Sequence, residues 1–439
     1  MNAIPSARGF QGVGPRLTLG ILVLLAALSQ VDRGILGLVV QPVSAHFGIN
    51  DFQISLLQGA AFAIFYAVLG LPFGVVADRW SRRGLIFIGV AIWSLAAAGC
   101  GLAASFNQLV LARLLVGAGE AALYPAALSL ISDIFPRHRL ASAVSVFSIG
   151  SSIGAGVSLG FGGVLVDLFT KTPVSLPLVG PVEAWQAVFV ATGAPGLLLA
   201  PLILLAPEPR RGATAAPPAP WRPLFAFMHS RRHFFIRHFT AFSLLSLLAM
   251  GNGAWMPALM MRRFGFTPGQ AGIAFGLMAA VTNTVGMLAA GALLDRLIRR
   301  GVSDAPMRLF VWLTPVAAAF AIVGSLSPSP VVFLTCMAVA QFGYSLSGPA
   351  ATAIQLVAPA TMRGRLSALF NVVFYLVGYG FGPSVVALLT TYLYRDPNAV
   401  HLSIATTMAV IAPIAWLVML SGLKPMREAM ALGEAQRDA

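Results

Sequence analysis

The sequence predicts an all-α membrane protein in which twelve transmembrane helices form two pseudo-symmetric six-helix bundles. Of its 439 residues, 58% are hydrophobic and only 10% are charged, and the mean hydropathy is +0.85. Soluble domains carry about 25% charged residues. A helix that crosses a bilayer needs about 20 apolar residues, and each half of the chain contains six such runs. A charged motif that returns at half-chain distance completes the prediction.

The apolar runs set the boundaries of the expected helices. Their approximate bounds are 17–41, 54–77, 84–105, 107–131, 140–166 and 185–206, then 234–261, 270–294, 308–326, 330–357, 366–393 and 401–422. The first run is too long for the core of a signal peptide, so we expect it to remain as helix 1. Glycines from Gly150 to Gly163 in the fifth run favour close helix approach.

We expect an N-terminal half over 1–206, a cytoplasmic linker over 207–233, a C-terminal half over 234–422 and a cytoplasmic tail over 423–439. The linker is rich in proline and arginine. Such a composition is typical of a disordered spacer, which is the interpretation we prefer for this segment.

A charged motif occurs after the second apolar run and again after the eighth. It consists of Gly74, Asp78, Arg79, Arg82 and Arg83, and it returns as Gly291, Asp295, Arg296, Arg299 and Arg300. Every residue of the second copy lies 217 positions after its counterpart (291 − 74). A pattern repeated at half-chain period indicates a duplicated unit, as in many transporters. The alternative, two basic turns that merely keep a loop in the cytoplasm, explains the arginines but not the matched glycine and aspartate.

We therefore interpret both copies as gating loops. Asp78 lies at the cytoplasmic end of helix 2, where it could face the N-terminus of helix 11 just after Arg365. A carboxylate is stabilised at the positive end of a helix dipole. We expect this contact only when the cytoplasmic side of the molecule is closed.

The distribution of positive charge predicts the orientation. Of the 28 lysines and arginines, 22 fall on the side of the linker, 2 lie within spans, and only Lys171, Arg262, Arg263 and Arg395 fall on the opposite side. Cytoplasmic loops carry the excess of positive charge. Both termini are therefore expected in the cytoplasm. The net charge of +14 then reflects topology, and we expect no nucleic-acid partner.

Four ionisable residues lie within the expected spans, all in the first half: Asp32, Arg33, Arg113 and Glu120. An ionisable group inside a bilayer costs several kcal/mol unless it is paired or hydrated, so it indicates function. Arg113 and Glu120 are seven residues apart and share one helix face. We expect Asp32 to meet Arg113, with Arg33 and Glu120 nearer the middle of the membrane. A purely structural ion-pair network is the alternative.

These positions suggest roles. Glu120, with Asp32 as the competing site, is the candidate for carrying a coupled proton, and Arg33 or Arg113 is the candidate for binding an anionic substrate group. Further candidates for the substrate cavity lie on polar stripes of the apolar runs: Tyr124, Asn252, Trp255, Gln341, Tyr344, Asn371 and Tyr375. Such stripes serve helix packing as often as ligand binding.

The motifs of other function classes are absent from the sequence. It has no phosphate-binding lysine loop, no zinc-ligand cluster and no nucleophile–base set outside the apolar runs. Its two cysteines, Cys100 and Cys336, lie in apolar runs and indicate no disulfide framework. We therefore expect no enzyme activity and no cofactor, and a gradient as the energy source.

Two six-helix halves with this loop motif resemble the major facilitator superfamily. The usual motif has a second glycine where this chain has Ser81 and, in the repeat, Ile298. Several stretches resemble the bacterial Spinster-like transporters: Asp32-Arg33, Leu56 to Gly59, Trp93 to Gly101, Arg113 to Ala121 and Ser132 to Pro136. This resemblance implies proton-linked movement of lysophospholipid-like amphiphiles across a bacterial inner membrane, with roles for Asp32, Arg33 and Glu120.

The organic anion symporters share the same charged residues and are the second candidate family. They usually show Trp-Phe-Pro where this chain has Ile134-Phe-Pro136. A ligand-sensing membrane receptor and a passive channel are further alternatives. Against a receptor, we expect no output domain, because the twelve spans take up the 439 residues. Against a channel, a pore does not need an intramembrane carboxylate or a duplicated gating loop. The expected partners are a small solute, protons and the lipid bilayer, with the protein as a monomer.

The predicted topology can be tested with single cysteines. An impermeant thiol reagent applied to intact cells should label Lys171→Cys and should not label Arg222→Cys, because the positive charges place these residues on opposite sides. Labelling at position 222 without labelling at position 171 would contradict the orientation.

Overall fold

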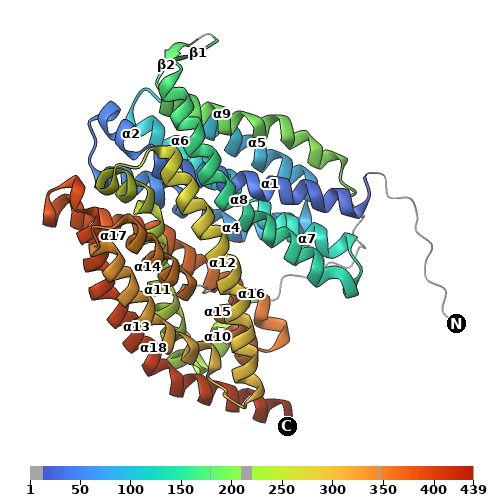
Figure 1. Ribbon diagram of the computed structural model, residues 1–439. Helices are drawn as coiled ribbons and strands as arrows, with labels where there is room; N and C mark the ends of the chain where they lie inside the picture. Colours follow the sequence, from blue (N-terminus) through green and yellow to red (C-terminus); the bar gives the residue numbers. More distant parts are fainter. Residues whose placement is uncertain (1–12, 178, 209–219, 345–346, 439) are drawn as a thin grey trace.

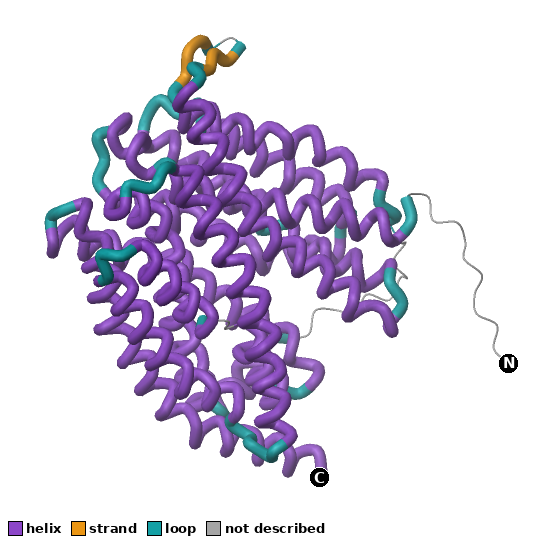
Figure 2. The backbone as a smooth tube through the Cα atoms, viewed as in Figure 1, coloured by secondary structure: helices purple, strands orange, loops and turns teal. Residues whose placement is uncertain are grey.

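The structure is a computed structural model that describes residues 13–177, 179–208, 220–344 and 347–438. These residues are almost entirely helical (Figures 1 and 2). The exception is a short antiparallel hairpin of β1 (Val174–Leu176) and β2 (Gly180–Val182), in which Val174 pairs with Val182.

Six spans make up the first half. They are span 1, α1 (Pro15–Leu38) followed by α2 (Val40–Phe47); span 2, α3 (Asp51–Ser55), η1 (Leu56–Ala60) and α4 (Ala61–Arg79); span 3, α5 (Arg82–Cys100); span 4, α6 (Phe106–Glu120) and α7 (Leu123–Ile134); span 5, α8 (Arg137–Lys171); and span 6, α9 (Ala184–Leu199) and η2 (Ala200–Leu205).

Six more make up the second half. They are span 7, α11 (Arg232–Phe264); span 8, α12 (Pro268–Arg299); span 9, α13 (Ala305–Leu326); span 10, α14 (Pro330–Gly343) and α15 (Ser347–Val357); span 11, α16 (Ala360–Tyr375), η3 (Leu376–Phe381), α17 (Gly382–Leu388) and η4 (Leu389–Tyr394); and span 12, η5 (Pro397–Ala399) and α18 (Val400–Asp438).

Eleven helical stretches among the described residues are long and apolar enough to cross a membrane. The 35-residue α8 is the remaining long helix. The predicted fold class, twelve helices in a multi-pass membrane protein, is confirmed.

Short connections and helix caps explain where the spans begin. The side chains of Asn50 and Thr267 each cap a helix on the side of the hairpin, and in both cases a glutamine three residues later completes a capping box. Gly48 and Gly265 end α2 and α11 with positive φ angles of 63° and 67°, a conformation that glycine adopts at little cost.

The segment between the halves differs from the expected disordered spacer. Residues 221–230 form the helix α10 (Trp221–Ser230), in which Leu224 is fully buried while Trp221 and Phe225 are exposed. The periodicity of a ten-residue amphipathic helix was masked by the proline- and arginine-rich residues around it. The expected tail is also helical, because α18 continues to Asp438.

We call the side that carries the hairpin the outer side and the side that carries α10 the inner side. Figure 1 shows the two halves close together near the hairpin and diverging toward the ends of α7 and α10. The 35-residue α8 packs extensively along both α1 of its own half and α12 of the other half. It is therefore the principal helix through which the halves meet.

Glycines permit the close approach of α8, as the sequence suggested. A Cβ on Gly154 would lie 2.7 Å from the carbonyl oxygen of Ala27 in α1. A Cβ on Gly156 would lie 2.9 Å from the carbonyl oxygen of Gly276 in α12. Real side chains do not tolerate such contacts, so these backbones pack directly against each other.

The first copy of the charged motif holds the N-terminal half together. Arg82 is buried and forms an ion pair with Asp133 at the end of span 4. Glu208, which follows span 6, accepts hydrogen bonds from the backbone N–H groups of Arg82 and Arg83, each at 3.1 Å, at the N-terminus of α5. The side chain of Asp78 lies outside the described part of the structure, so its gating contact remains a prediction.

The second copy has a more open environment. Asp295, Arg296 and Arg299 are exposed on the last turns of α12, and Arg79 of the first copy is also exposed. Arg300 is the exposed C-cap residue of the same helix. A Cβ on Gly74 or Gly291 would meet no atom within 4 Å. Neither glycine is needed for packing in this conformation.

Asp304 anchors the inner end of the second half. It precedes α13 and is only 1% exposed. Its carboxylate accepts hydrogen bonds from Arg308 at 2.8 and 2.9 Å and from Arg427 of span 12 at 2.5 Å. Burial alone would raise the pKa of Asp304, but the hydrogen bonds from the two arginines outweigh it and hold the pKa below its usual range. The carboxylate therefore ties span 12 to the loop before span 9.

Asp304→Asn should lower the free energy of unfolding by about 2 kcal/mol, since hydrogen bonds to charged groups contribute about 1.5–3 kcal/mol. Because the folded-state pKa is depressed, this stabilisation is complete above the unfolded-state pKa of about 4 and is lost as the pH falls through the lower folded value. The melting-temperature difference between wild type and Asp304→Asn should be constant from about pH 8 to pH 5 and shrink only below about pH 4.

Glu428→Gln is the matched control. Both side chains of the Lys424–Glu428 pair are exposed, and their N–O distance is 3.8 Å, so this pair contributes little stability. Equal melting temperatures for the two variants would show that the Asp304 contacts contribute no stability.

Candidate functional site

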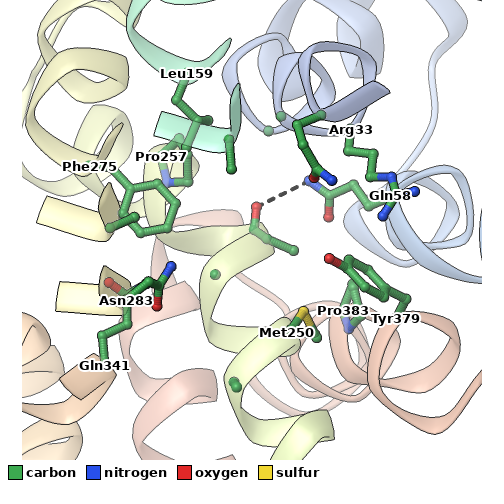
Figure 3. A pocket seen from close by; sticks show the side chains of 18 of the residues that line it. Arg33, Gln58, Leu159, Met250, Pro257, Phe275, Asn283, Gln341, Tyr379 and Pro383 are labelled. Atoms are coloured by element: carbon green, nitrogen blue, oxygen red, sulfur yellow. Dashed lines mark hydrogen bonds between the residues drawn. The ribbon is translucent and has the colours of Figure 1, made fainter. Parts of the chain in front are cut away.

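Among the described residues, two cavities that share lining residues lie between the halves, apart from a third near the hairpin side that Asp51 and Arg262 line. The deep chamber has a volume of about 270 Å³ and is lined by apolar side chains that include Phe62, Leu159, Met250, Pro257 and Phe275 (Figure 3). The inner vestibule has a volume of about 580 Å³ and extends past residues such as Gly70 of span 2 and Gly364 of span 11, toward the inner side. The molecule is therefore in an inward-facing conformation.

The two cavities share five lining residues, which mark the place where they join: Gln30, Arg33, Ala155, Asn283 and Tyr379. Arg33 is the charged member of this set. The Arg33 guanidinium therefore borders both cavities.

Arg33 forms an ion pair with Glu120 at the junction. Its Nε donates to Oε2 of Glu120 at 2.8 Å, and its Nη2 contacts the same oxygen. The side chain of Arg33 is 14% exposed, whereas that of Glu120 is only 1% exposed. The cation thus faces the cavity while its counter-ion is covered.

Aromatic rings surround the Arg33 guanidinium. Its Cζ lies 4.5 Å from the ring centroid of Phe62, 5.1 Å from that of Tyr66 and 5.8 Å from that of Tyr379. Ring faces attract a cation within about 6 Å. Tyr375 stacks on Tyr379 at 5.9 Å and extends this wall into the vestibule. The rings hold the guanidinium in place without neutralising it.

The expected pairing of Asp32 with Arg113 is not observed between the side chains. Arg113 is 1% exposed and donates to the backbone carbonyl oxygen of Asp32 at 3.1 Å and to that of Leu57 at 3.2 Å. Both carboxylate oxygens of Asp32 are buried without a hydrogen-bond partner in the described residues. Arg113 does contact Asp32, but through a backbone carbonyl oxygen, an acceptor that residue spacing alone does not show.

Several residues anticipated from the sequence line the cavities. Tyr124, Asn371 and Tyr375 line the vestibule, and Gln341 and Tyr344 line the deep chamber. The hydroxyl of Tyr124 contacts Ser151 of α8.

Asn252 and Trp255 lie outside both cavities. Asn252 is 3% exposed and contacts Met337 in span 10, and Trp255 is fully buried and donates to the carbonyl oxygen of Pro383 at 2.9 Å. These two residues pack helices in this conformation, which was the alternative interpretation of the polar stripes.

Other lining residues were not anticipated. Gln58 donates to the carbonyl oxygen of Ala254 at 3.3 Å across the two halves, and Asn283 lies opposite it in the deep chamber (Figure 3). Phe62 and Tyr66 are four residues apart and therefore share the cavity face of span 2. Span 2 also carries Phe65 and Phe73, so the sequence does not distinguish the aromatic residues that face the cavity from the others.

Interrupted helices position the site. Span 4 breaks directly after Glu120, where α6 ends and a turn at Ala121 leads into α7. In the second half, α14 of span 10 ends at Gly343, and Tyr344 follows it in a turn. Backbone that leaves the helical pattern at membrane depth is tolerated where it lines a cavity, and transporter sites are often built at such breaks. No cluster of three potential metal ligands occurs among the described residues.

Comparisons with known proteins agree with this architecture. Residues 22–383 match the sequence profile of the Major Facilitator Superfamily. An MFS-type efflux pump of Mycolicibacterium smegmatis is 28% identical over 409 residues, which cover 91% of this chain and 90% of that protein. A D-galactonate transporter of Escherichia coli is 25% identical over 440 residues, covering 93% of this chain and 96% of that protein.

A solved structure has the same fold. The inward-facing, unoccupied crystal structure of a bacterial homolog to the human lysosomal transporter Spinster superposes with a TM-score of 0.77 at 23% identity, over 95% of this chain and 97% of that one. A spinster homolog of Rattus norvegicus is also similar, at 26% identity over 90% of this chain and 77% of that protein. The profile match, the two six-span halves and the cavity between them lead to one conclusion: the chain belongs to the Major Facilitator Superfamily and is a multi-pass membrane transporter, not an enzyme.

Proposed function

We propose that this protein is a proton-coupled secondary transporter that moves a small anionic amphiphile by alternating access. The observation that carries the proposal is Arg33, whose side chain is 14% exposed where the vestibule adjoins the deep chamber, with its counter-ion Glu120 only 1% exposed.

The shape of the cavity supports an amphiphile. Arg33 presents a cation to an anionic head group, while the deep chamber beyond it offers Phe62, Met250 and Phe275 to an apolar tail. Burial of a tail is worth about 0.8 kcal/mol for each CH₂ group. A chamber of about 270 Å³ is large enough for part of an acyl or aryl chain. The tail would thus supply affinity, and the arginine would supply orientation.

Competition for Arg33 supports proton coupling. An anion that binds Arg33 takes the place of Glu120, whose other carboxylate oxygen is already buried without a hydrogen-bond partner among the described residues. A buried carboxylate that loses its ion pair is costly, so Glu120 would then take up a proton. Anion binding and protonation of Glu120 therefore favour each other.

Asp32 is the competing proton carrier. Its carboxylate is 1% exposed and lacks a hydrogen-bond partner in the described part of the chain, which is compatible with a neutral side chain in this state. The two carboxyl groups lie on adjoining spans, so the pair would titrate jointly.

The setting of the transporter follows from the charge distribution. We propose that the inner side is cytoplasmic, with both termini there, and that the protein works as a monomer in a bacterial inner membrane. The positive charges of the inner loops support this orientation. We retain 1–206 and 234–422 as the two halves that rock against each other.

A sugar-acid symporter is the second candidate. The similarity to a D-galactonate transporter favours it. So does the polar wall of the deep chamber, where the hydroxyl of Thr282 donates to Gln341 at 3.1 Å beside Asn283. Such groups could bind substrate hydroxyls. The apolar majority of the lining supports the amphiphile instead.

Uptake by proteoliposomes after a pH jump should separate these functions. We expect a lysophospholipid to raise the melting temperature of the purified protein and to accumulate only when a proton gradient is imposed. Accumulation of galactonate but not of the lysolipid would select the second candidate. Transport of either compound that runs down its gradient with no response to pH would contradict proton coupling.

The Glu120→Gln variant tests the proton site. Glutamine mimics a protonated carboxylate, so the variant should bind substrate and retain counterflow exchange, while pH-driven accumulation falls at least about tenfold, since one coupled step is missing. Asp32→Asn is the matched variant. If Glu120→Gln accumulates substrate normally while Asp32→Asn does not, the coupled proton belongs to span 1.

A further inference from the structure

The helix α10, which precedes span 7 on the inner side, carries an exposed aromatic pair. Trp221 and Phe225 are 43% and 54% exposed, and their stacked rings have centroids 6.0 Å apart. Residues four apart lie on the same face of a helix. Neither residue lines the deep chamber or the vestibule. A clustered, exposed apolar surface is typical of an interaction site.

The opposite face of α10 is fixed to the second half. The ring of Phe227 lies 5.9 Å from that of Phe235 in α11, whereas residues eight positions apart in one continuous helix are separated by about 12 Å. The chain therefore folds back at Arg231, the residue between the two helices, whose guanidinium lies 4.3 Å from the ring of Phe227. Leu224 is fully buried. This packing leaves the aromatic pair outside.

The first residue of this connection is tied to span 11. The carbonyl oxygen of Pro220, the N-cap of α10, accepts a hydrogen bond from Nη1 of Arg365 at 2.9 Å. Arg365 lies in the first turns of α16, and α11 begins directly beyond the other end of α10. The helix thus bridges the inner ends of spans 7 and 11, and its exposed face has a fixed position relative to both.

The inner boundary of the membrane passes close to α10. Ile236, in the second turn of α11, is 62% exposed, as expected for a side chain in contact with lipid tails. Arg232 and His233, about one turn earlier, are also exposed but are polar. Span 7 therefore enters the hydrocarbon region between His233 and Ile236. Because α10 ends at Ser230, it lies at the level of the lipid head groups.

The polar surface of α10 is basic. Arg222 and His229 are both exposed, and they lie seven residues apart on a face that adjoins Phe225. The sequence contains no aspartate or glutamate between Glu208 and Asp295. Among the described residues, Arg222 takes part in no ion pair. Aromatic residues beside a basic face are the composition of helices that lie in the plane of a membrane interface.

We infer that α10 is a binding surface for anionic lipids of the leaflet on the inner side, with the aromatic pair inserted among the head groups and Arg222 paired with lipid phosphates. A tryptophan favours this depth, because its ring is apolar and its indole N–H can donate to a head group. Such binding would attach the inner ends of spans 7 and 11 to the membrane surface. The inference concerns neither the transported solute nor the proton, so it goes beyond the proposed function.

A fluorescent label on α10 can test the inference in the full-length protein. Ala226→Cys provides an exposed position for a bimane label and keeps the aromatic pair and Arg222. The native Cys100 and Cys336 are buried and would be replaced by alanine. The protein is placed in nanodiscs of phosphatidylcholine with increasing amounts of phosphatidylglycerol, and a phosphatidylcholine that carries a nitroxide quenches a label at the membrane. We expect quenching to increase with the phosphatidylglycerol content.

Arg222→Gln should lower the ratio of membrane-bound to free α10 about fivefold, which corresponds to about 1 kcal/mol for one basic residue at an anionic surface. Trp221→Ala combined with Phe225→Ala should reduce quenching at every lipid composition, because the apolar contact is lost with or without charge on the lipid. Lys424→Gln is the matched control. It removes a positive charge from the inner side outside α10, where the side chain of Lys424 is 79% exposed.

Two results would overturn the inference. If quenching is equal with and without phosphatidylglycerol, or if Arg222→Gln behaves like Lys424→Gln, α10 does not recognise anionic lipids. A label that no membrane quenches would place the aromatic pair in water or against another protein. Proton-driven uptake that fails while the label is quenched as expected would count against the proposed function alone.

Discussion

The cost of charge in a bilayer is the constraint on which this structure depends. An arginine inside the membrane needs a counter-charge, and Arg33 has Glu120 together with the faces of three aromatic rings. Those partners come from span 4, span 2 and span 11. A single cation therefore brings together helices of both halves at the centre of the molecule. The uncovered side of the arginine faces the two cavities.

The break in span 4 follows from the same constraint. Glu120 is the last residue of α6, so its carboxylate lies where the helix already departs from regular hydrogen bonding. Arg113, two turns earlier, satisfies itself on backbone carbonyl oxygens of spans 1 and 2. Arg113 thus holds the N-terminal half together although it also lines the deep chamber, and Arg33 faces both cavities. Both residues are arginines. Their roles differ because Arg113 donates to backbone carbonyl oxygens, whereas Arg33 pairs with the carboxylate of Glu120.

Composition and periodicity were sufficient for the fold and for part of the site. The twelve apolar runs predicted the spans because bilayer thickness fixes their length. The four charged residues were found because ionisable groups are rare within such runs. The hydrogen-bond partners of Arg113 could not be predicted from the sequence. They are backbone carbonyl oxygens, and every span contains these. The prediction that Asn252 and Trp255 line the cavity was wrong, because a helical stripe does not reveal which neighbouring helix it faces. The helix α10 was not predicted, because it lies within a proline-rich segment.

The backbone contact between α8 and α12 has a mechanical consequence. Where Gly156 meets Gly276, no side chains of these two residues interlock across the boundary between the halves. Interlocked side chains resist rotation, because each must leave one groove and enter another. Two smooth backbones can pivot with little repacking. The glycines therefore set the close spacing of this crossing, and a larger side chain at either position would force α8 and α12 apart.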